Sequence, residues 1–381
     1  MAAVLVAALF AAAHLDGAVA AGAQAGSDDT SAASSSAAGS LLLQPGLAGF
    51  FEQGGFTAEA RYAPWLRLRD GGASWSFDKR QNASLSAALQ QTRSLRLVAS
   101  EHFRYGQDAL TWDPGATRPF DFVDALPAAV PDDLFTDTEL GFSLQPARGW
   151  ALNGSAGYAA YGGASAASQQ LLPLQQGPQL YLGLDHELTR SDQISGELYA
   201  SHTSASNGLR SSLVKLTGGW RQQLDASTRA RLSAGASVYG QAKAGQPAAA
   251  GLHPVAAAEI AHFLPGLRPR IELGAVAALG PHPNPLTAEL VERAELAVSA
   301  RWLLQDRLSL RARAATAREL RSAPTQLLLG AFDASLDLGG DLALSAGAET
   351  LWQHAQTSLP AVRWLAFTAL SFGARNLLSD R

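Results

Sequence analysis

From residue 56 onward the chain alternates, one residue at a time, between apolar side chains and small, polar or charged ones. In STRARLSAGASVYG, residues 227–240, Arg229 and Arg231 fall on one parity, and Leu232 and Ala234 fall on the other. Successive side chains of a β-strand point to opposite faces of its sheet, so this segment predicts a strand with one polar and one apolar face. No segment of comparable length has the 3.6-residue period of an amphipathic helix.

The alternation recurs along the chain and predicts about sixteen strands. Each is long enough for a tilted membrane-spanning strand, which needs about 9–11 residues. The predicted strands lie at about 56–69, 82–91, 94–106, 135–145, 149–161, 178–188, 192–203, 211–224, 228–240, 253–263, 267–280, 287–303, 307–318, 324–338, 341–352 and 360–374.

The connections between these strands alternate in length. Short ones, rich in Gly, Pro, Asp and Ser, lie at 92–93, 146–149, 189–192, 225–228, 265–268, 305–307 and 339–340. Longer ones lie between them, at 70–81, 107–134, 162–177, 204–210, 241–252, 281–286, 319–323 and 353–359. Outer-membrane barrels have tight periplasmic turns, longer external loops and an even strand number. The predicted fold class is therefore all-β: an antiparallel transmembrane β-barrel of about sixteen strands, with eighteen possible, and both ends on the periplasmic side.

A large soluble β-sandwich would show the same alternation, with its polar face in water. The barrel is favoured because the apolar faces are mostly Ala, Leu, Val and Gly, which is thin for a packed core but adequate against lipid. Aromatic residues also lie near strand ends, as in the girdles of membrane barrels. Trp150, Trp220, Phe263, Trp302 and Phe372 are predicted at the periplasmic edge, and Phe103, Tyr105, Tyr239, Trp352 and Trp364 at the outer edge.

The N-terminal segment has a different composition from the rest of the chain. Residues 1–20 form the only long apolar run, and the small-residue sites AVA (18–20) and AGA (21–23) follow it, although the run has no Lys or Arg at its start. Residues 1–23 are therefore predicted to be a secretory signal peptide, which implies a bacterial outer-membrane location reached through the periplasm. Residues 24–55 are predicted to be a disordered Ser/Ala/Gly-rich linker, 56–375 the barrel and 376–381 a tail. No further stretch of 18 apolar residues remains for a transmembrane helix.

Composition argues against several kinds of chemistry. The 381 residues include no Cys, which excludes disulfides, thiolate metal sites and a catalytic Cys. The net charge is −4, so nucleic-acid binding has no electrostatic support. The eight His show no ligand spacing along a strand face, so no metal and no cofactor are predicted. A Ser–His pair across neighbouring strands would be needed for an enzyme, and the chain is predicted not to be one.

Charged residues on the polar parity are the candidate functional residues. In a barrel of this size they line a water-filled channel, with one acidic wall facing a mainly basic wall. An equally physical interpretation is that neighbouring charges pair to hold the barrel's shape. Glu101 is the exception, since it shares the apolar parity and requires a bulge or an interface position. The acidic set is Asp137, Glu139, Asp185, Glu187, Glu197, Asp333, Asp337 and Glu349; the basic set is Lys215, Arg221, Arg229, Arg231, Arg268, Arg270, Arg293, Arg301, Arg311 and Arg313.

The longest connection, residues 107–134, is a candidate constriction loop or lid. Long barrel loops are often functional, although a solvated surface loop is an equally good interpretation. Its charged residues are Asp113, Arg118, Asp121, Asp124, Asp132 and Asp133, together with Asp108. The PHPNP sequence at 281–285 is interpreted as a rigid loop.

Residues 56–375 resemble a Gram-negative outer-membrane β-barrel of the porin type. More narrowly, FTAEARYAPWLRLR (56–69), NASLSAALQQTRSLRLVASEHFRYG (82–106) and VRWLAFTALSFGAR (362–375) resemble the porin-like barrels associated with exopolysaccharide secretion. Those barrels have eighteen strands where we count sixteen, and they end on an aromatic, whereas GARNLLSDR follows Phe372 here.

The resemblance implies a non-enzymatic channel for hydrophilic solutes. These solutes include a polysaccharide on its way out, and the partners would be outer-membrane lipid, the polysaccharide and a periplasmic export protein. A general diffusion porin for small solutes and a plugged structural or adhesive barrel remain as alternatives.

Overall fold

The computed structural model describes residues 14–26, 38–70, 75–107, 132–243, 249–264, 270–304, 307–321, 324–355 and 361–373. These residues form one nineteen-stranded antiparallel sheet and one short helix. None of the helical structure in these ranges is long and apolar enough to cross a membrane. The elements are β1 (His14–Gly26), β2 (Ala38–Gln53), β3 (Phe56–Tyr62), β4 (Trp65–Asp70), β5 (Trp75–Gln90), β6 (Leu95–Gln107), β7 (Asp132–Ala147), β8 (Trp150–Gly163), α2 (Ala166–Leu171), β9 (Gln175–Glu187), β10 (Asp192–Ala205), β11 (Leu209–Gln223), β12 (Thr228–Lys243), β13 (Ala249–Leu264), β14 (Arg270–Pro283), β15 (Leu290–Leu304), β16 (Leu308–Glu319), β17 (Thr325–Gly339), β18 (Leu342–Ala355) and β19 (Ala361–Gly373).

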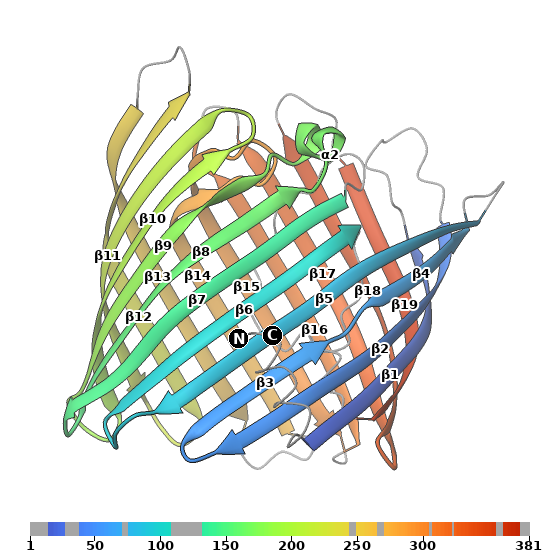
Figure 1. The fold of residues 1–381 in the computed structure, drawn as a ribbon, viewed down its shortest axis with the longest axis horizontal. Helices are drawn as coiled ribbons and strands as arrows, with labels where there is room; N and C mark the ends of the chain where they lie inside the picture. Colours follow the sequence, from blue (N-terminus) through green and yellow to red (C-terminus); the bar gives the residue numbers. More distant parts are fainter. Residues whose placement is uncertain are drawn as a thin grey trace.

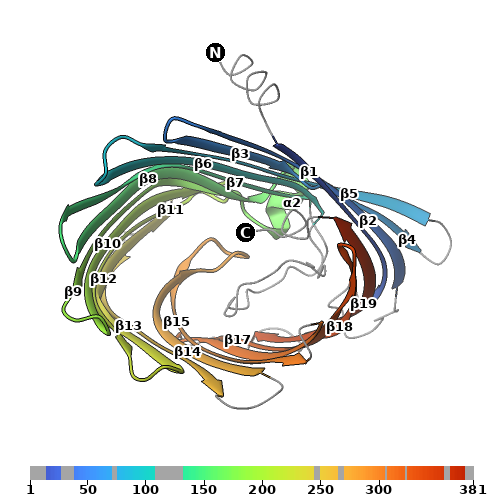
Figure 2. The same cartoon turned by 90° about the horizontal axis from the view of Figure 1, so that it is seen from below.

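The sheet closes on itself as a barrel. Each strand pairs with the next along the chain, and β19 pairs with β1 to complete the ring (Figures 1 and 2). Strands β3 and β4 both lie between β2 and β5, so they are two pieces of a single stave. The break falls at Ala63 and Pro64, where proline cannot donate a ladder hydrogen bond. The barrel therefore has eighteen staves, two more than the sixteen strands counted from the sequence.

The two additional strands are β1 and β2, in the segment predicted to be a signal peptide and a linker. Residues 1–13 lie outside the described residues. Residues 14–23 belong to β1, however, so both predicted cleavage sites fall within a paired barrel strand. Most of the predicted linker is β2, so that prediction is wrong for residues 38–53. The physical reason is composition. Strand β1 has small Ala and Gly residues on both faces. Strand β2 has large apolar residues on both faces, as at Leu41–Leu43 and Phe50–Phe51, so neither strand alternates between apolar and polar side chains.

Short turns and long connections lie at opposite ends of the barrel, as the sequence predicts. Figure 1 shows the tight turns at the lower end and α2 among the longer connections at the upper end. The turn between β2 and β3 uses Gly54 (φ 58°) and Gly55 (φ 82°), both in the left-handed region that two-residue hairpins require. His14 of β1 and Gly373 of β19 lie on the short-turn side, because β1 and β19 run antiparallel in register.

The outer face of the barrel is apolar. The large exposed side chains on β11 and β12, among them Leu216, Leu232 and Val238, share one parity. The charged residues share the other, except Arg210 at the long-loop end of β11. Most of the predicted girdle aromatics lie on this outer parity. Two do not: Tyr239 stacks on His253 with ring centroids 4.3 Å apart, and Phe263 lies under Arg270, both on the lumen face. Tyr239 shares the parity of Arg231, and Phe263 shares that of Glu259. The alternation in the sequence therefore already places both aromatic residues on the lumen face.

Glu101 lies on the outer face without a bulge. The β5–β6 and β6–β7 registers run unbroken through it. Its carboxylate accepts hydrogen bonds from the Thr136 hydroxyl, at 2.6 Å, and from the Thr138 hydroxyl on the neighbouring strand. Hydrogen bonds from two hydroxyl groups thus satisfy the Glu101 carboxylate, for which the sequence predicted a bulge or an interface position.

Candidate functional site in the barrel lumen

The lumen face of the wall carries the charges selected from the sequence. The strand registers place the following residues on the inward parity: Asp137, Glu139, Asp185, Glu187, Glu197, Asp333, Asp337, Glu349, Lys215, Arg221, Arg229, Arg231, Arg270, Arg293, Arg301, Arg311 and Arg313. Arg268 lies outside the described residues.

Several of these charges pair with neighbours along the wall. Arg231 Nη2 lies 2.8 Å from Glu197 Oε1, and Arg313 Nη2 lies 3.6 Å from Glu349 Oε2. The pairs are partly exposed, with 40% of the Arg231 side chain accessible. Ion pairs along the wall therefore account for part of the lumen charge. Other charged side chains beside these pairs remain accessible to water.

The short-turn half of β11–β16 forms a basic wall. Here cations outnumber carboxylates on the lumen face, and no charged residue lies on the outer parity of the same ranges, 215–223, 228–235, 257–264, 270–277, 297–304 and 308–315. We define the basic wall by Lys215, Arg221, Arg229, Arg231, Arg270, Arg301, Arg311 and Arg313, with Glu259 and Glu272 between them.

The short-turn half of β7–β10, by contrast, is acidic and rich in hydrogen-bonding groups. Glu139, Asp185 and Glu197 alternate along it with uncharged polar groups. Asn153 Nδ2 donates to Asp185 Oδ2 at 3.4 Å, and Gln179 Nε2 donates to Asp137 Oδ1 at 2.7 Å. The barrel is thus lined by walls of unlike charge, as its sequence suggests.

One hairpin leaves the wall and enters the lumen. Strand β14 pairs with β13 only up to Leu279, opposite Ala256, while β14 and β15 stay paired as far as Pro283 and Leu290. Above that point β13 continues beside β12 alone. Figure 2 shows the end of the β14–β15 hairpin turned toward the middle of the ring. We call residues 280–293 the inward hairpin.

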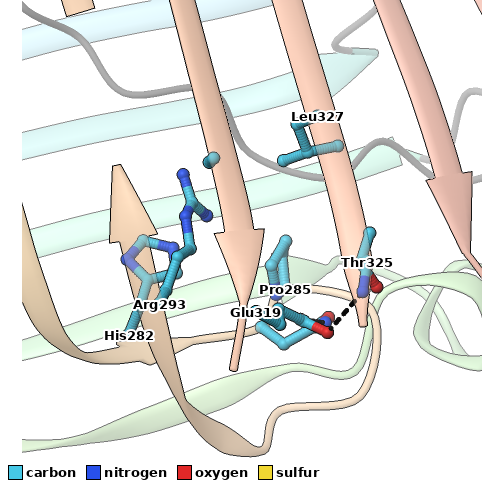
Figure 3. A pocket seen from close by; sticks show the side chains of 8 residues that line it. His282, Pro285, Arg293, Glu319, Thr325 and Leu327 are labelled. Carbon is cyan, nitrogen blue, oxygen red and sulfur yellow. Dashed lines mark hydrogen bonds between the residues drawn. The ribbon is translucent and has the colours of Figure 1, made fainter. Parts of the chain in front are cut away.

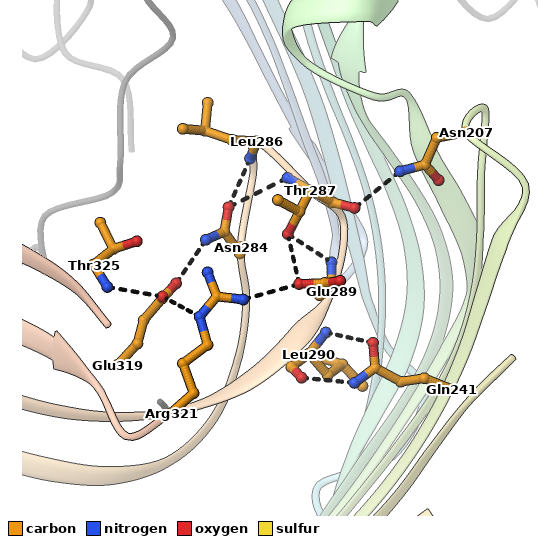
Figure 4. Close-up of polar contacts among 10 residues, drawn as sticks. All are labelled: Asn207, Gln241, Asn284, Leu286, Thr287, Glu289, Leu290, Glu319, Arg321 and Thr325. Carbon is orange, nitrogen blue, oxygen red and sulfur yellow. Dashed lines mark hydrogen bonds and ion pairs between the residues drawn. The ribbon is translucent and has the colours of Figure 1, made fainter. Parts of the chain in front are cut away.

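One side of the inward hairpin is tied to β12 and β13. Gln241 makes two hydrogen bonds to the backbone of Leu290: its Nε2 donates to the carbonyl at 2.7 Å, and its Oε1 accepts from the amide at 3.0 Å. His253 Nδ1 lies 2.5 Å from Glu292 Oε1. At the tip, Asn207 Nδ2 donates to the carbonyl of Thr287 at 2.9 Å (Figure 4). These contacts replace the β13 ladder that the hairpin has left.

The other side is tied to the β16–β17 connection through Glu319. This carboxylate is buried, with 6% of its side chain exposed, and accepts from Asn284 Nδ2 at 2.6 Å and the Thr325 amide at 3.1 Å. Arg321 Nε lies 2.8 Å from it, and Arg321 Nη1 lies 3.0 Å from Glu289 Oε2 (Figure 4). A carboxylate with three donors is well satisfied in a buried site. We call Glu319 and these donors the latch.

A small pocket lies beside the latch. Its cavity volume is about 10 Å³, which is room for about one water molecule. Figure 3 shows His282 and Arg293 together on one side of it, Pro285 beside Glu319, and Thr325 and Leu327 on the other side. The pocket therefore lies between the inward hairpin and the barrel wall, and it is too small for a sugar.

Apolar packing supports the hairpin from below. Ala297, Ala315, Ala317, Leu327, Leu329 and Leu351 form a buried cluster, and Leu286 of the inward hairpin packs against it. These residues belong to the lumen parity of β15–β18. An apolar patch inside a water-filled barrel would be costly if it stayed wet, so its burial stabilises the folded-in position of the hairpin.

The long-loop half of β4–β7 holds a second cluster that sequence reasoning missed. The Arg80 guanidinium lies 5.7 Å from the ring centroid of Trp65, and that of Arg104 lies 5.4 Å from Phe135. Arg104 Nη2 also lies 3.0 Å from Asp133 Oδ2. The alternating WLRLR at 65–69 was an available signal, because it places Arg67 on the parity of Trp65.

The predicted constriction loop is only partly described. Asp108, Asp113, Arg118, Asp121 and Asp124 lie outside the described residues, while Asp132 and Asp133 begin β7 and therefore belong to the wall. Among the described residues, the segment that enters the lumen is the PHPNP loop, interpreted from the sequence only as rigid. Its partners Asn207, Gln241 and Glu319 come from other hairpins, which a single sequence cannot bring together.

Within the described ranges, no group of three or more His, Asp or Glu is placed to hold a metal ion. Two histidines of the wall, His102 and His186, have neighbours on adjacent strands. His186 stacks on Trp150 with ring centroids 4.0 Å apart, and His102 lies opposite Ser84 and Asp137 in the strand registers.

Comparison with known proteins supplies the remaining evidence. A family model described as the EpsX exopolysaccharide export family matches residues 6–376. No curated protein sequence matches the chain. Among solved structures, it is similar to Pseudomonas aeruginosa OpdO, with 12% identity, 94% and 97% of the two chains covered and a TM-score of 0.52. It is also similar to OccK2 (OpdF) of that organism, with 11% identity, 94% and 98% covered and a TM-score of 0.51. The outer-membrane protein OpdK has 11% identity, 95% and 98% covered and a TM-score of 0.50. These structures share the outer-membrane porin fold.

Proposed function

Because this chain belongs to the EpsX exopolysaccharide export family, we propose that it is an outer-membrane channel through which a hydrophilic polysaccharide leaves the cell. The observation that carries the proposal is the difference between the two faces of a closed barrel. Outside, Leu216, Leu232 and their neighbours form an apolar surface suited to lipid. Inside, charged and hydrogen-bonding side chains can exchange with the hydration shell of a sugar chain.

The inward hairpin gives this channel its proposed selectivity. A polysaccharide is an extended chain, so it can thread past a local constriction that a folded or branched solute cannot. Glu319 and Leu286 hold the hairpin on the β15–β17 side and leave the rest of the lumen to the solute. The chemistry is transport alone, without a cofactor, and a periplasmic export protein would deliver the chain to the short-turn rim.

Planar-bilayer recording of the refolded full-length chain tests the proposal. Steady conductance that long dextran reduces, and that glucose leaves unchanged, supports polysaccharide passage. Steady conductance that dextran does not affect would instead support a general diffusion porin. The absence of any conductance would contradict both channels and favour a plugged structural barrel.

The membrane location has its own test. A barrel of this kind migrates differently in a detergent gel before and after boiling, and it is insoluble without detergent. A chain that stays soluble and monomeric in plain buffer would contradict the outer-membrane assignment.

A further inference from the structure

On the basic wall, arginines face arginines across neighbouring strands. Arg221 on β11 stands directly opposite Arg231 on β12, and Arg301 on β15 stands directly opposite Arg311 on β16. Like charges in directly opposed positions on one face of a sheet repel each other and destabilise the pairing. Two such pairs of arginines on the same wall destabilise the barrel, and the barrel fold does not need them.

Nearby carboxylates offset only part of this repulsion. Glu272 serves two cations, with Arg270 Nη2 at 3.3 Å and Arg301 Nη1 at 3.8 Å. Arg311 Nε lies 3.9 Å from Asp333 Oδ1, and Arg231 Nη2 lies 2.8 Å from Glu197 Oε1. A guanidinium has five N–H donors, so Arg301, which shares the Glu272 carboxylate with Arg270, can also bind an anion.

The arginine side chains are also accessible from the lumen. The exposed fraction is 60% for Arg270, 46% for Arg301 and 31% for Arg311. Since these side chains lie on the inward face, their exposure is to the lumen and not to lipid. An anion passing through the barrel can therefore reach them.

We propose that the basic wall recognises an acidic polysaccharide, one whose repeating unit carries carboxylate groups. This inference rests on the proposed export function and specifies its substrate class. Guanidinium groups bind carboxylates in a planar, two-pronged geometry, and two opposed arginines present two such groups to one chain. The anion also relieves the repulsion between them.

The acidic wall has a complementary role. Glu139 and Asp185 on β7 and β9 repel a polyanion and hold it against the basic wall, whereas Glu197 on β10 is paired with Arg231. Their repulsion also weakens binding overall. A channel needs sites that are attractive enough to enter and weak enough to leave, and unlike walls provide both.

The test uses the refolded full-length chain in planar bilayers. Current block is measured with oligogalacturonate and with dextran oligomers of matched length, added to each side in turn. We expect oligogalacturonate to block at a concentration at least tenfold lower than dextran, and the difference to shrink as KCl rises, because salt screens exposed charges. In a KCl gradient, the reversal potential should indicate preference for chloride.

The variant R301Q/R311Q removes one opposed pair and should reduce the preference for oligogalacturonate at least threefold. R318Q is the matched control, because Arg318 lies on the same strand but on the outer parity near the long-loop rim. If R301Q/R311Q fails to give the heat-modifiable band of a folded barrel, R221Q/R231Q removes the other pair.

Three outcomes would overturn the inference. Equal block by dextran and oligogalacturonate, or a preference that both double variants retain, removes the acidic-chain specificity while leaving an export channel intact. Steady conductance that neither polymer reduces contradicts the proposed export function as well, and the inference falls with it.

Discussion

Arg293 and Arg301 lie on the same strand and the same face, yet they occupy different environments. Arg293, in the long-loop half of β15, has 4% of its side chain exposed and lies 2.5 Å from Glu295. Arg301, in the short-turn half, has 46% exposed and faces Arg311. The comparison teaches that one strand has two roles: its upper end belongs to the inward hairpin and is buried against the wall, and its lower half stays open to the solute.

The largest expected effect on stability comes from a substitution in the latch. Glu319→Ala removes a buried carboxylate and leaves Asn284 Nδ2 and the Thr325 amide without their acceptor, while Arg321 keeps Glu289. Each buried donor left without a partner costs about 1–3 kcal/mol. We expect lower stability in denaturant titration and, as the hairpin loosens, larger and noisier single-channel conductance. Glu289→Gln, at the exposed end of the same network, is the control and should change little. Conductance unchanged by Glu319→Ala would show that the hairpin does not limit flow.

Within the open half, the two faces of β12 can be compared at neighbouring positions. Ala234 lies on the outer parity and Ser233 on the lumen parity. Ala234→Arg should reduce the free energy of membrane folding by about 2–4 kcal/mol, whereas Ser233→Arg should be tolerated. Refolding yield into lipid vesicles measures both variants. If the two positions tolerate arginine equally, the assignment of the outer face to lipid is wrong.

The two arginines themselves give a smaller and more specific contrast. Arg293→Gln should lower stability by about 1–3 kcal/mol, because it leaves Glu295 with a weaker partner in a buried site. Arg301→Gln should cost under about 1 kcal/mol, as expected for an exposed pair. It should nevertheless move the reversal potential in a KCl gradient toward cation preference, and Arg293→Gln should not. A reversed pattern would mean that the lower half is structural and the upper half lines the path.

The smallest effect lies in the turn between β11 and β12. Hydrogen bonds from Ser227 and Thr228 lower the pKa of Asp225 to about 2 from its usual 3.8. The charged form is therefore favoured in the folded state, and its contribution is present above pH 3.8 and lost as the pH falls through about 2. Asp225→Asn should be slightly less stable than the parent at pH 7, and the difference should shrink as the pH falls toward 2. An advantage of the parent that is as large at pH 2 as at pH 7 would contradict the shifted pKa.

The sequence predicted most of the wall, because strand alternation is a local signal. All sixteen predicted strands are present, and the turns at 225–228 and 339–340 lie where they were expected. Strand β1 was missed because Ala and Gly on both faces conceal a two-residue period, and β2 because Leu and Phe lie on both of its faces.

The interior was less predictable, because it depends on contacts between distant segments. Glu319 was predicted to begin the 319–323 connection, and only the fold places it at the end of β16, accepting from Asn284 on another hairpin. Tyr239 and Phe263 were assigned by their nearness to strand ends, although parity already placed them inside. Proline at 281, 283 and 285 indicated a stiff loop but not its direction.

The pairing of β1 with β19 has a consequence for biogenesis. Val19 meets Phe372, so the first strand of the ring must wait for the last one to be made and positioned. Until then both strands are open edges with unpaired backbone groups, which readily recruit other chains. A truncated product that lacks β19 cannot seal the ring at all. Pairing of β1 with β19 is thus possible only for a completed chain. An interrupted chain keeps open strand edges that bind other chains, and it is exposed to chaperones and proteases.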